Sequence, residues 1–227
     1  MKIGIIGAGN IGGALVRRFK AVGHDVAVAN SRGPETLAQL AIETGATAVT
    51  VEQAARGRDL VVVTIPQASV PKLPAGLFDG VPASVVVIDT GNYYPTQRDG
   101  RIDGIEDGAT ESRWVSERLG RPVVKAFNNI YAQHLLEHGM PAGTAGRIAL
   151  PVAGDDVAAK TIVIHLLDEI GFDGVDAGSL DDSWRQQPGS PVYGKDHDRE
   201  GVAAGLAEAR PGRTPEWSAG PKRPGSV

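Results

Sequence analysis

Short apolar runs alternate with amphipathic stretches along most of the chain. The runs are rich in β-branched residues and are bounded by turn residues, which predicts buried strands. Strands are expected at Ile3–Ile6, Val26–Ala29, Thr47–Val49, Leu60–Ile65, Val85–Asp89, Val123–Phe127, Ile148–Ala153 and Gly174–Asp176. Strands that alternate with helical patterns are typical of a parallel α/β sheet.

The amphipathic stretches predict helices at Ile11–Ala21, Pro34–Thr44, Val51–Ala55, Glu111–Leu119, Ala132–His138 and Asp156–Ile170. Boundary residues support two of them. Pro34 suits the first position of its helix, and Gly45 suits the end. Asp155 or Asp156 is a suitable N-cap for the last helix, which we expect to stop at Gly171.

Two segments depart from this alternation. Residues 91–108 form a long loop-like stretch, which we expect to be either functional or mobile. Residues 210–227 are rich in proline, glycine and basic residues, which predicts a flexible tail or one ordered only by a partner. The predicted organisation is a domain over residues 1–180, a covering segment over 181–209 and this tail.

The first strand ends in a glycine-rich turn, Gly7-Ala8-Gly9-Asn10-Ile11-Gly12. In a dinucleotide-binding βαβ unit, the first glycine permits the turn, the second leaves room for the pyrophosphate, and the third brings the helix close to the strand. Free N–H groups and the dipole at the helix start favour negative charge. We therefore assign Gly7, Gly9, Asn10, Ile11 and Gly12 to cofactor binding. A glycine-rich turn that binds nothing is the alternative.

The second strand ends in Asn30-Ser31-Arg32, where NAD-specific folds place an acidic residue that holds the ribose hydroxyls. A carboxylate there would repel a 2′-phosphate, whereas a hydroxyl and a guanidinium suit one. These three residues therefore predict NADP(H) rather than NAD(H). The alternative is that Arg32 is a solvated surface residue and Ser31 a helix-entry hydroxyl.

The fourth strand ends in Thr64-Ile65-Pro66-Gln67. Ligands in such sheets bind beyond the carboxyl ends of the strands, so we assign all four residues to the cofactor site. Pro66 has no N–H to donate and would contribute shape. Gln67 either reaches the ligand or belongs to an ordinary strand-ending turn. Together these features predict a Rossmann-type, doubly wound, mostly parallel α/β fold with a small C-terminal extension.

Six segments together resemble one family. They are the glycine turn, Asn30–Arg32, Thr64–Pro66, Val123–Ile130, Pro151–Asp156 and Asp176–Leu180. They are similar to segments of the NADP-dependent oxidoreductases that use a 5-deazaflavin coenzyme (coenzyme F-420). The V-K-A-F-N sequence that starts at Val124 also resembles the oxidoreductase domain of the STEAP metalloreductases. The resemblance covers about Met1 to Leu180, most of the chain.

The resemblance implies a small α/β protein, usually a homodimer, with NADP(H) along the carboxyl edge of the sheet. It implies direct hydride transfer, ring carbon to ring carbon, to a planar deazaflavin or flavin-like acceptor. By resemblance, Ala126 lies at the cofactor, and the backbone of Asn128, Asn129 and Ile130 meets the nicotinamide amide and the acceptor ring. Such transfer depends on proximity and orientation, so no catalytic acid or base is nominated.

Two features depart from the family pattern and leave the acceptor open to a flavin, a quinone-like molecule or a small carbonyl. The deazaflavin enzymes have a histidine where this chain has Asn128 or Asn129. The chain also adds a segment beyond Ser183, which we expect to cover the acceptor site of its own subunit or of a partner.

Two other functions are compatible with the same cofactor-binding features. A small-carbonyl or imine reductase would need a helical dimerisation domain, which the sequence does not show after Asp176. A sensor would bind NADP(H) without catalysis.

Some side chains suggest other chemistry but have a plainer interpretation. Hydroxyacid dehydrogenases carry their lysine on a long helical domain that this chain lacks, so we expect Lys125 to be structural. His134 and His138 have the i, i+4 spacing of a metal pair, yet no third ligand follows them, so no metal site is predicted. Tyr93 and Tyr94 would either line the acceptor pocket or anchor a loop.

Composition limits the function further. The 227 residues are 41% hydrophobic, enough for one substantial core, and the net charge of −4 gives no indication of a nucleic-acid partner. The absence of cysteine excludes disulfides, thiolate catalysis and thiolate metal sites. Neither a signal peptide nor an apolar run of membrane-spanning length is evident. We expect a cytoplasmic protein with no membrane partner.

Overall fold

The computed structural model describes residues 1–220 and confirms the Rossmann-type fold. Six parallel strands form the central sheet in the order β3-β2-β1-β4-β5-β6. They are β1 (Lys2–Ile6), β2 (Asp25–Ala29), β3 (Thr47–Ala48), β4 (Leu60–Val63), β5 (Val86–Asp89) and β6 (Val124–Lys125). The last two strands, β7 (Ala149–Val152) and β8 (Asp173–Asp176), form a separate parallel pair. This pair meets the central sheet through an antiparallel bridge between Lys125 and Ala153.

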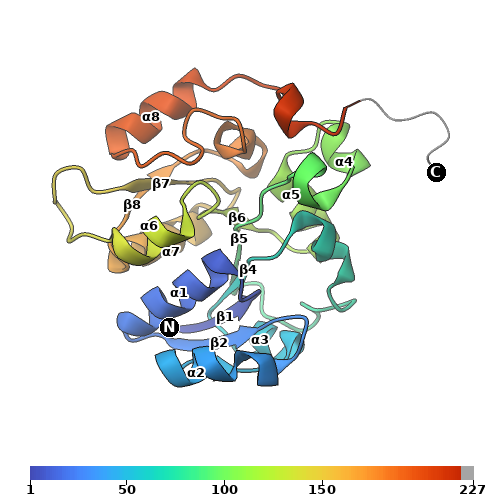
Figure 1. Cartoon of the computed structure of the whole chain (residues 1–227), viewed down its shortest axis with the longest axis vertical. Helices are drawn as coiled ribbons and strands as arrows, with labels where there is room; N and C mark the ends of the chain where they lie inside the picture. The colour runs from blue at the N-terminus through green and yellow to red at the C-terminus, as the bar shows by residue number, and fades with distance from the viewer. Residues whose placement is uncertain (221–227) are drawn as a thin grey trace.

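Helices cover both faces of the central sheet (Figure 1). On one face lie α1 (Asn10–Ala21), α6 (Ala132–Glu137) and α7 (Val157–Glu169), whose apolar side chains share one core with the sheet. On the other face lie α3 (Val51–Ala55) and α5 (Glu111–Leu119). The remaining helices are α2 (Ala38–Thr44), α4 (Asp103–Glu106) and α8 (Arg199–Glu208). Asp156 is the N-cap of α7, as one of the two predicted alternatives.

The strand register brings the carboxyl ends of the strands to one edge. Ile6 lies opposite Val63, Val63 opposite Asp89, and Asp89 opposite Lys125. Neighbouring strands stand about 4.8 Å apart, so the ends of β2, β1, β4, β5 and β6 span roughly 19 Å. The segments predicted to bind the cofactor all begin along this edge.

Several elements differ from the prediction. The helix expected at Pro34–Thr44 starts as a 3-10 turn, and α2 begins only at Ala38. The loop at 91–108 contains a π-helical turn at Pro95–Asp99 as well as α4. The covering segment contains α8, which the sequence did not predict. Two glycines weaken its helical pattern, and few of its residues are buried.

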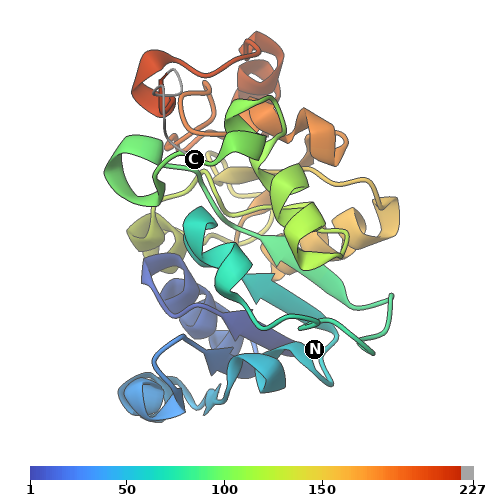
Figure 2. The same cartoon turned by 90° about the vertical axis from the view of Figure 1, so that its right-hand side faces the viewer.

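The described part of the tail packs on the rest of the chain, whereas the sequence predicts a flexible segment. The Arg213 guanidinium donates to the Glu111 carboxylate at 2.6 Å, and the Ser218 hydroxyl donates to Glu106 at 2.9 Å. The two views agree in placing this red segment beside the green loop and helix region around α4 (Figures 1 and 2). The rest of the predicted tail, residues 221–227, lies outside the described residues.

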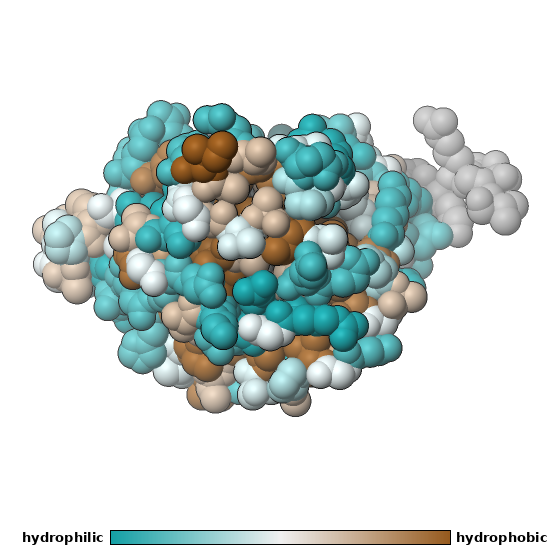
Figure 3. Space-filling model, turned by 90° about the horizontal axis from the view of Figure 1, so that it is seen from below, coloured by the Kyte–Doolittle hydropathy of each residue, from teal (hydrophilic) through white to brown (hydrophobic). Residues whose placement is uncertain are grey.

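The surface adds little about assembly. Within residues 1–220, no helix combines the length and the apolar character that a membrane crossing requires. Seen from below, hydrophilic side chains surround several separate apolar groups (Figure 3). The expected homodimer stays a prediction.

Candidate cofactor and acceptor site

The three glycines of the first turn meet three different requirements. Gly7 has a φ of +112°, and a Cβ there would lie 2.2 Å from the Thr64 carbonyl oxygen. A Cβ on Gly12 would lie 2.0 Å from the Gly7 carbonyl oxygen, so only glycine lets α1 approach the turn. A Cβ on Gly9 would meet no atom within 4 Å. Gly9 therefore borders open space, which fits a glycine that leaves room for a ligand.

The start of α1 has free hydrogen-bond donors. Gly9 is its N-cap and provides no capping side chain, and the first turn contains no acidic residue. Among the described residues, the backbone N–H groups of Ala8 to Gly12 have no acceptor. Unpaired N–H groups at the positive end of a helix favour an anion. This turn therefore fits a pyrophosphate.

The segment after β2 is shaped by Asn30. Its Oδ1 accepts from the Arg32 N–H at 2.9 Å, and its Nδ2 donates to the Thr36 hydroxyl at 2.8 Å. The Ser31 and Arg32 residues are exposed, and the Arg32 guanidinium has no acceptor within residues 1–220. A free guanidinium and a hydroxyl at this strand end fit a phosphate group, and no carboxylate in the Asn30–Arg32 segment opposes one.

Gln67 is the buried polar residue of the segment after β4. Its side chain is fully buried, and neither amide atom has a hydrogen-bond partner among the described residues. It lies against the turn after β5, since a Cβ on Gly91 would be 3.0 Å from its Oε1. An unpaired buried amide costs about 1–3 kcal/mol, so a polar ligand group at this edge would be stabilised by Gln67.

The turn after β6 is held in an unusual conformation. Phe127 has a φ of +63° although it is not glycine, a conformation that costs about 1–3 kcal/mol and recurs at ligand sites. Its buried ring packs edge-on against Phe19, with centroids 6.5 Å apart. Within the described residues, the backbone N–H groups of Phe127 to Ile130 have no acceptor. These donors are available to a bound group.

The side chain of Asn128 is engaged within the protein, whereas the Asn129 Oδ1 is buried without a hydrogen-bond partner among the described residues. The Asn128 Nδ2 donates to the Asn92 Oδ1 at 3.0 Å and to the Gln186 carbonyl at 2.6 Å, while its Oδ1 accepts from the Gln186 Nε2 at 3.0 Å. The Asn129 carbonyl accepts from the Gly194 N–H at 2.9 Å. The side chain of Asn128 therefore fastens the covering segment to the turn, which leaves the backbone N–H groups and the Asn129 Oδ1 for a ligand.

The first and last turns of the edge belong to one apolar cluster. Ala126, Phe127 and Ile130 share it with Ala8 and Ile11. The two sets of free N–H groups are therefore carried by segments that pack together.

A buried charge cluster lies behind the edge and consists of Asp89, Glu111, Lys125 and Arg213. The fully buried Lys125 ammonium donates to the Gly91 carbonyl at 2.5 Å and lies 3.5 Å from Glu111 and 3.7 Å from Asp89. Arg213 completes the cluster from the tail. Two acids thus face two cations, and Lys125 supports the turn after β5, as its predicted structural role requires.

Aromatic side chains join the loop after β5 to the C-terminal segments. The Tyr94 and Tyr193 hydroxyls form a hydrogen bond, and the Trp217 ring lies 5.8 Å and 6.0 Å from the two phenol rings. Burial raises the pKa of Tyr193, and the hydrogen bond between the Tyr193 and Tyr94 hydroxyls adds to the shift. Tyr93 is fully buried, with its pKa raised by burial to about 12, and its hydroxyl accepts from the Ile102 N–H at 2.9 Å. Tyr93 is therefore a loop anchor.

A cavity of about 740 Å³ lies between the α4–α5 region, the covering segment and the tail. Its walls include Thr110, Trp184, Gln187 and Arg213. None of the residues predicted to contact the acceptor lines it, so the cavity and the turn after β6 are different features.

Several residues that hold Asn128 and Lys125 in place are distant from them in sequence, and the sequence analysis did not identify them. Asn92 and Gln186 hold Asn128, while Glu111 and Arg213 enclose Lys125. None of these belongs to a local motif, and no periodicity marks them.

The family model described as "NADP oxidoreductase coenzyme F420-dependent" matches residues 2–93. The Escherichia coli (strain K12) protein named "Putative protein YjhV" is 47% identical over 60 residues, which are 26% of this chain and 44% of that protein. The chain thus spans less than half the length of this relative.

Two solved structures share most of the fold. A hypothetical protein, SMa0349 from Sinorhizobium meliloti, is 31% identical with a TM-score of 0.73, over 86% of this chain and 94% of that one. A "putative f420 dependent nadp-reductase" from Arthrobacter sp. FB24 is 24% identical with a TM-score of 0.65, over 79% and 86% of the two chains. The second likeness shows the fold alone.

Proposed function

The chain belongs, over residues 2–93, to the family of coenzyme F420-dependent NADP oxidoreductases, and from this premise we propose that it transfers hydride between NADPH and a planar acceptor of the deazaflavin or flavin type. The family is NADP(H)-dependent. The identity of the acceptor, and the residues that bind NADPH and the acceptor, belong to the proposal.

One observation carries the proposal. Two turns with free backbone N–H groups, Ala8–Gly12 and Phe127–Ile130, begin at the same edge of the sheet and pack into one apolar cluster. The first turn suits a pyrophosphate and the second suits the carboxamide of a nicotinamide. Between them lie Thr64–Gln67 and the turn after β5, so one extended dinucleotide would contact all four segments.

Ser31 and Arg32 are the residues proposed to select NADP(H). Arg32 would donate to the 2′-phosphate as a charged fork and Ser31 as a hydroxyl. The Asn30 amide shapes the segment that presents them, since it accepts from the Arg32 N–H and donates to Thr36. Its role is therefore to position Arg32 rather than to contact the ribose.

The chain contributes orientation rather than acid–base chemistry. Bound NADPH supplies the hydride, and a proton from water completes the reduced acceptor. The Asn128 side chain fixes the backbone of its turn and fastens the covering segment to it. Lys125 and Glu111 are sealed in the buried charge cluster and have no access to a substrate.

The test is an acceptor panel with purified protein, in which NADPH absorbance is followed with a deazaflavin, a flavin, a quinone, a small carbonyl and a cyclic imine. The proposal predicts turnover with the deazaflavin or the flavin. It also predicts that Gly9→Ala, which keeps the fold but narrows the pyrophosphate site, loses that turnover at limiting NADPH.

Two other results would overturn the proposal. Turnover with the carbonyl or the imine alone would identify a reductase of that class, although within residues 1–220 α8 is the only α-helix after β8. Tight NADPH binding without turnover on any acceptor would identify a sensor.

A further inference from the structure

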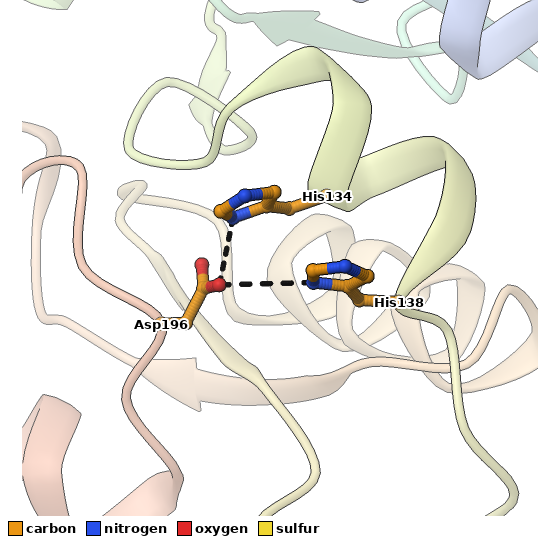
Figure 4. A group of neighbouring side chains, drawn as sticks. All are labelled: His134, His138 and Asp196. Atoms are coloured by element: carbon orange, nitrogen blue, oxygen red, sulfur yellow. Dashed lines mark ion pairs between the residues drawn. The ribbon is translucent and has the colours of Figure 1, made fainter.

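Two histidines and one aspartate from separate parts of the chain meet beside the acceptor turn. His134 lies on α6, His138 is the residue immediately after it, and Asp196 belongs to the covering segment (Figure 4). One potential ligand atom from each residue lies within 4.8 Å of the others. The sequence supplied the histidine pair but no third ligand nearby, and the fold provides one.

We propose that His134, His138 and Asp196 bind a divalent transition-metal ion, with zinc as the best match, and that this ion fastens the covering segment to α6. The proposal is independent of the cofactor and of the acceptor.

The donor set selects the class of metal. Imidazole nitrogens suit zinc, copper, iron and nickel, whereas calcium and magnesium prefer oxygen ligands throughout. Two histidines with one carboxylate, plus water in the remaining position, are a ligand set that zinc accepts. Because the chain contains no cysteine, thiolate sites do not compete for the ion.

The three ligand atoms lie within 4.8 Å of one another, so rotations of the side chains would bring them to the spacing around a tetrahedral ion. Ligand atoms that each lie 2.0–2.2 Å from zinc stand about 3.3–3.5 Å apart. The Asp196 Oδ2 lies 2.7 Å from the His134 Nδ1 and 3.8 Å from the His138 Nδ1, so the two distances bracket that value. The imidazole rings lie nearly parallel, with centroids 4.5 Å apart, and the Nδ1 of each faces the Asp196 carboxylate (Figure 4).

The site is open to solvent on one side. The side chains are 31% exposed for His134, 46% for His138 and 30% for Asp196. An ion has access from solution and keeps at least one position for water, as in open three-ligand zinc sites.

Metal binding here would act on the acceptor region. Asp196 follows Tyr193 and Gly194, and the Gly194 N–H donates to the Asn129 carbonyl at 2.9 Å. Tyr193 in turn contacts Tyr94. An ion that holds Asp196 on α6 would therefore order the part of the covering segment that closes over the turn after β6.

The test uses the full chain, freed of any affinity tag and treated with a chelator. Cobalt(II) is titrated and its visible d–d absorption is followed, and zinc is then added as a competitor. The expected result is one bound cobalt per chain, displaced by zinc. His134→Gln and Asp196→Asn should each weaken binding at least tenfold, while the exposed helical control His165→Gln should leave it unchanged.

Hydrogen exchange gives a second readout that does not depend on colour. Zinc should slow the exchange of residues 193–198 in the native chain and not in His134→Gln. The absence of saturable binding would overturn the proposal, as would binding that survives in the His134→Gln/His138→Gln double variant. Loss of binding in His197→Gln alone, with Asp196→Asn unaffected, would show that the ligand set is wrong.

Discussion

The Arg213 guanidinium donates to the Glu111 carboxylate at 2.6 Å and thereby joins the C-terminal tail to the buried charge cluster. Glu111 is fully buried, and its other near cation is Lys125 at 3.5 Å. Removing one partner of a buried pair leaves an uncompensated charge. The described part of the tail, residues 210–220, therefore packs as part of the folded domain.

Arg213→Met should lower the free energy of unfolding by about 2–4 kcal/mol, because Glu111 loses its shortest charged contact. Urea denaturation measures the change. Arg210→Met removes an exposed arginine from the same tail and is the matched control. Combining Arg213→Met with Glu111→Gln should recover part of the loss. A single variant as stable as the control would show that the contact contributes nothing.

Alanine substitutions of Gly9 and Gly12 should separate an effect on stability from an effect on cofactor binding. Gly12→Ala places a Cβ 2.0 Å from the Gly7 carbonyl and should destabilise the protein by about 1–3 kcal/mol. Gly9→Ala meets no protein atom within 4 Å, so its stability should change by less than about 0.5 kcal/mol. Its Kd for NADP+ should nevertheless rise at least tenfold, about 1.4 kcal/mol. Native-like NADP+ affinity in Gly9→Ala would place the pyrophosphate elsewhere.

Arg32→Ala should raise the Kd for NADP+ at least tenfold, about 1.4 kcal/mol, and leave the Kd for NAD+ almost unchanged. The reason is that only the 2′-phosphate requires the guanidinium. Isothermal titration with both cofactors measures the difference. Arg56 is an exposed arginine at the C-terminal end of α3. Arg56→Ala therefore controls for a general loss of positive charge. An equal loss for both cofactors would exclude Arg32 as the phosphate ligand.

The local features of the fold could be predicted because each depends on neighbours in sequence. The glycine turn, the segment after β2 and the parallel strands follow from short patterns, and the structure keeps them. The role of Asn128 could not be predicted, because its partners Asn92 and Gln186 come from distant loops. The same reason explains why Asp196 and Arg213 were missed.

The Asp155 carboxylate should make stability depend on pH in the acid range. The Arg113 guanidinium, and then the Leu180 N–H, hold the pKa of Asp155 below its ordinary value. Its contribution is therefore fully present above about pH 4, the unfolded value, and is lost as pH falls through the lower folded value. Since the side chain is 48% exposed, the effect is at most about 1 kcal/mol.

Urea denaturation of Asp155→Asn checks this effect. The variant should be less stable than the native chain at about pH 6, and the difference should shrink below about pH 4. Asp79→Asn removes an exposed carboxylate elsewhere and is the comparison variant. If the difference in stability between Asp155→Asn and the native chain stays constant through the acid range, the lowered pKa of Asp155 does not contribute to stability.

The central claim is direct hydride transfer between NADPH and a planar acceptor, and isotope transfer in a single turnover tests it most directly. NADPH deuterated at the transferring position of the nicotinamide ring is mixed with excess protein and a deazaflavin, whose reduced ring carbon does not exchange its hydrogen with water. Mass spectrometry of the reduced acceptor gives the result. The proposal predicts that the deuterium is found on the acceptor ring carbon. Reduced acceptor without the label would contradict it.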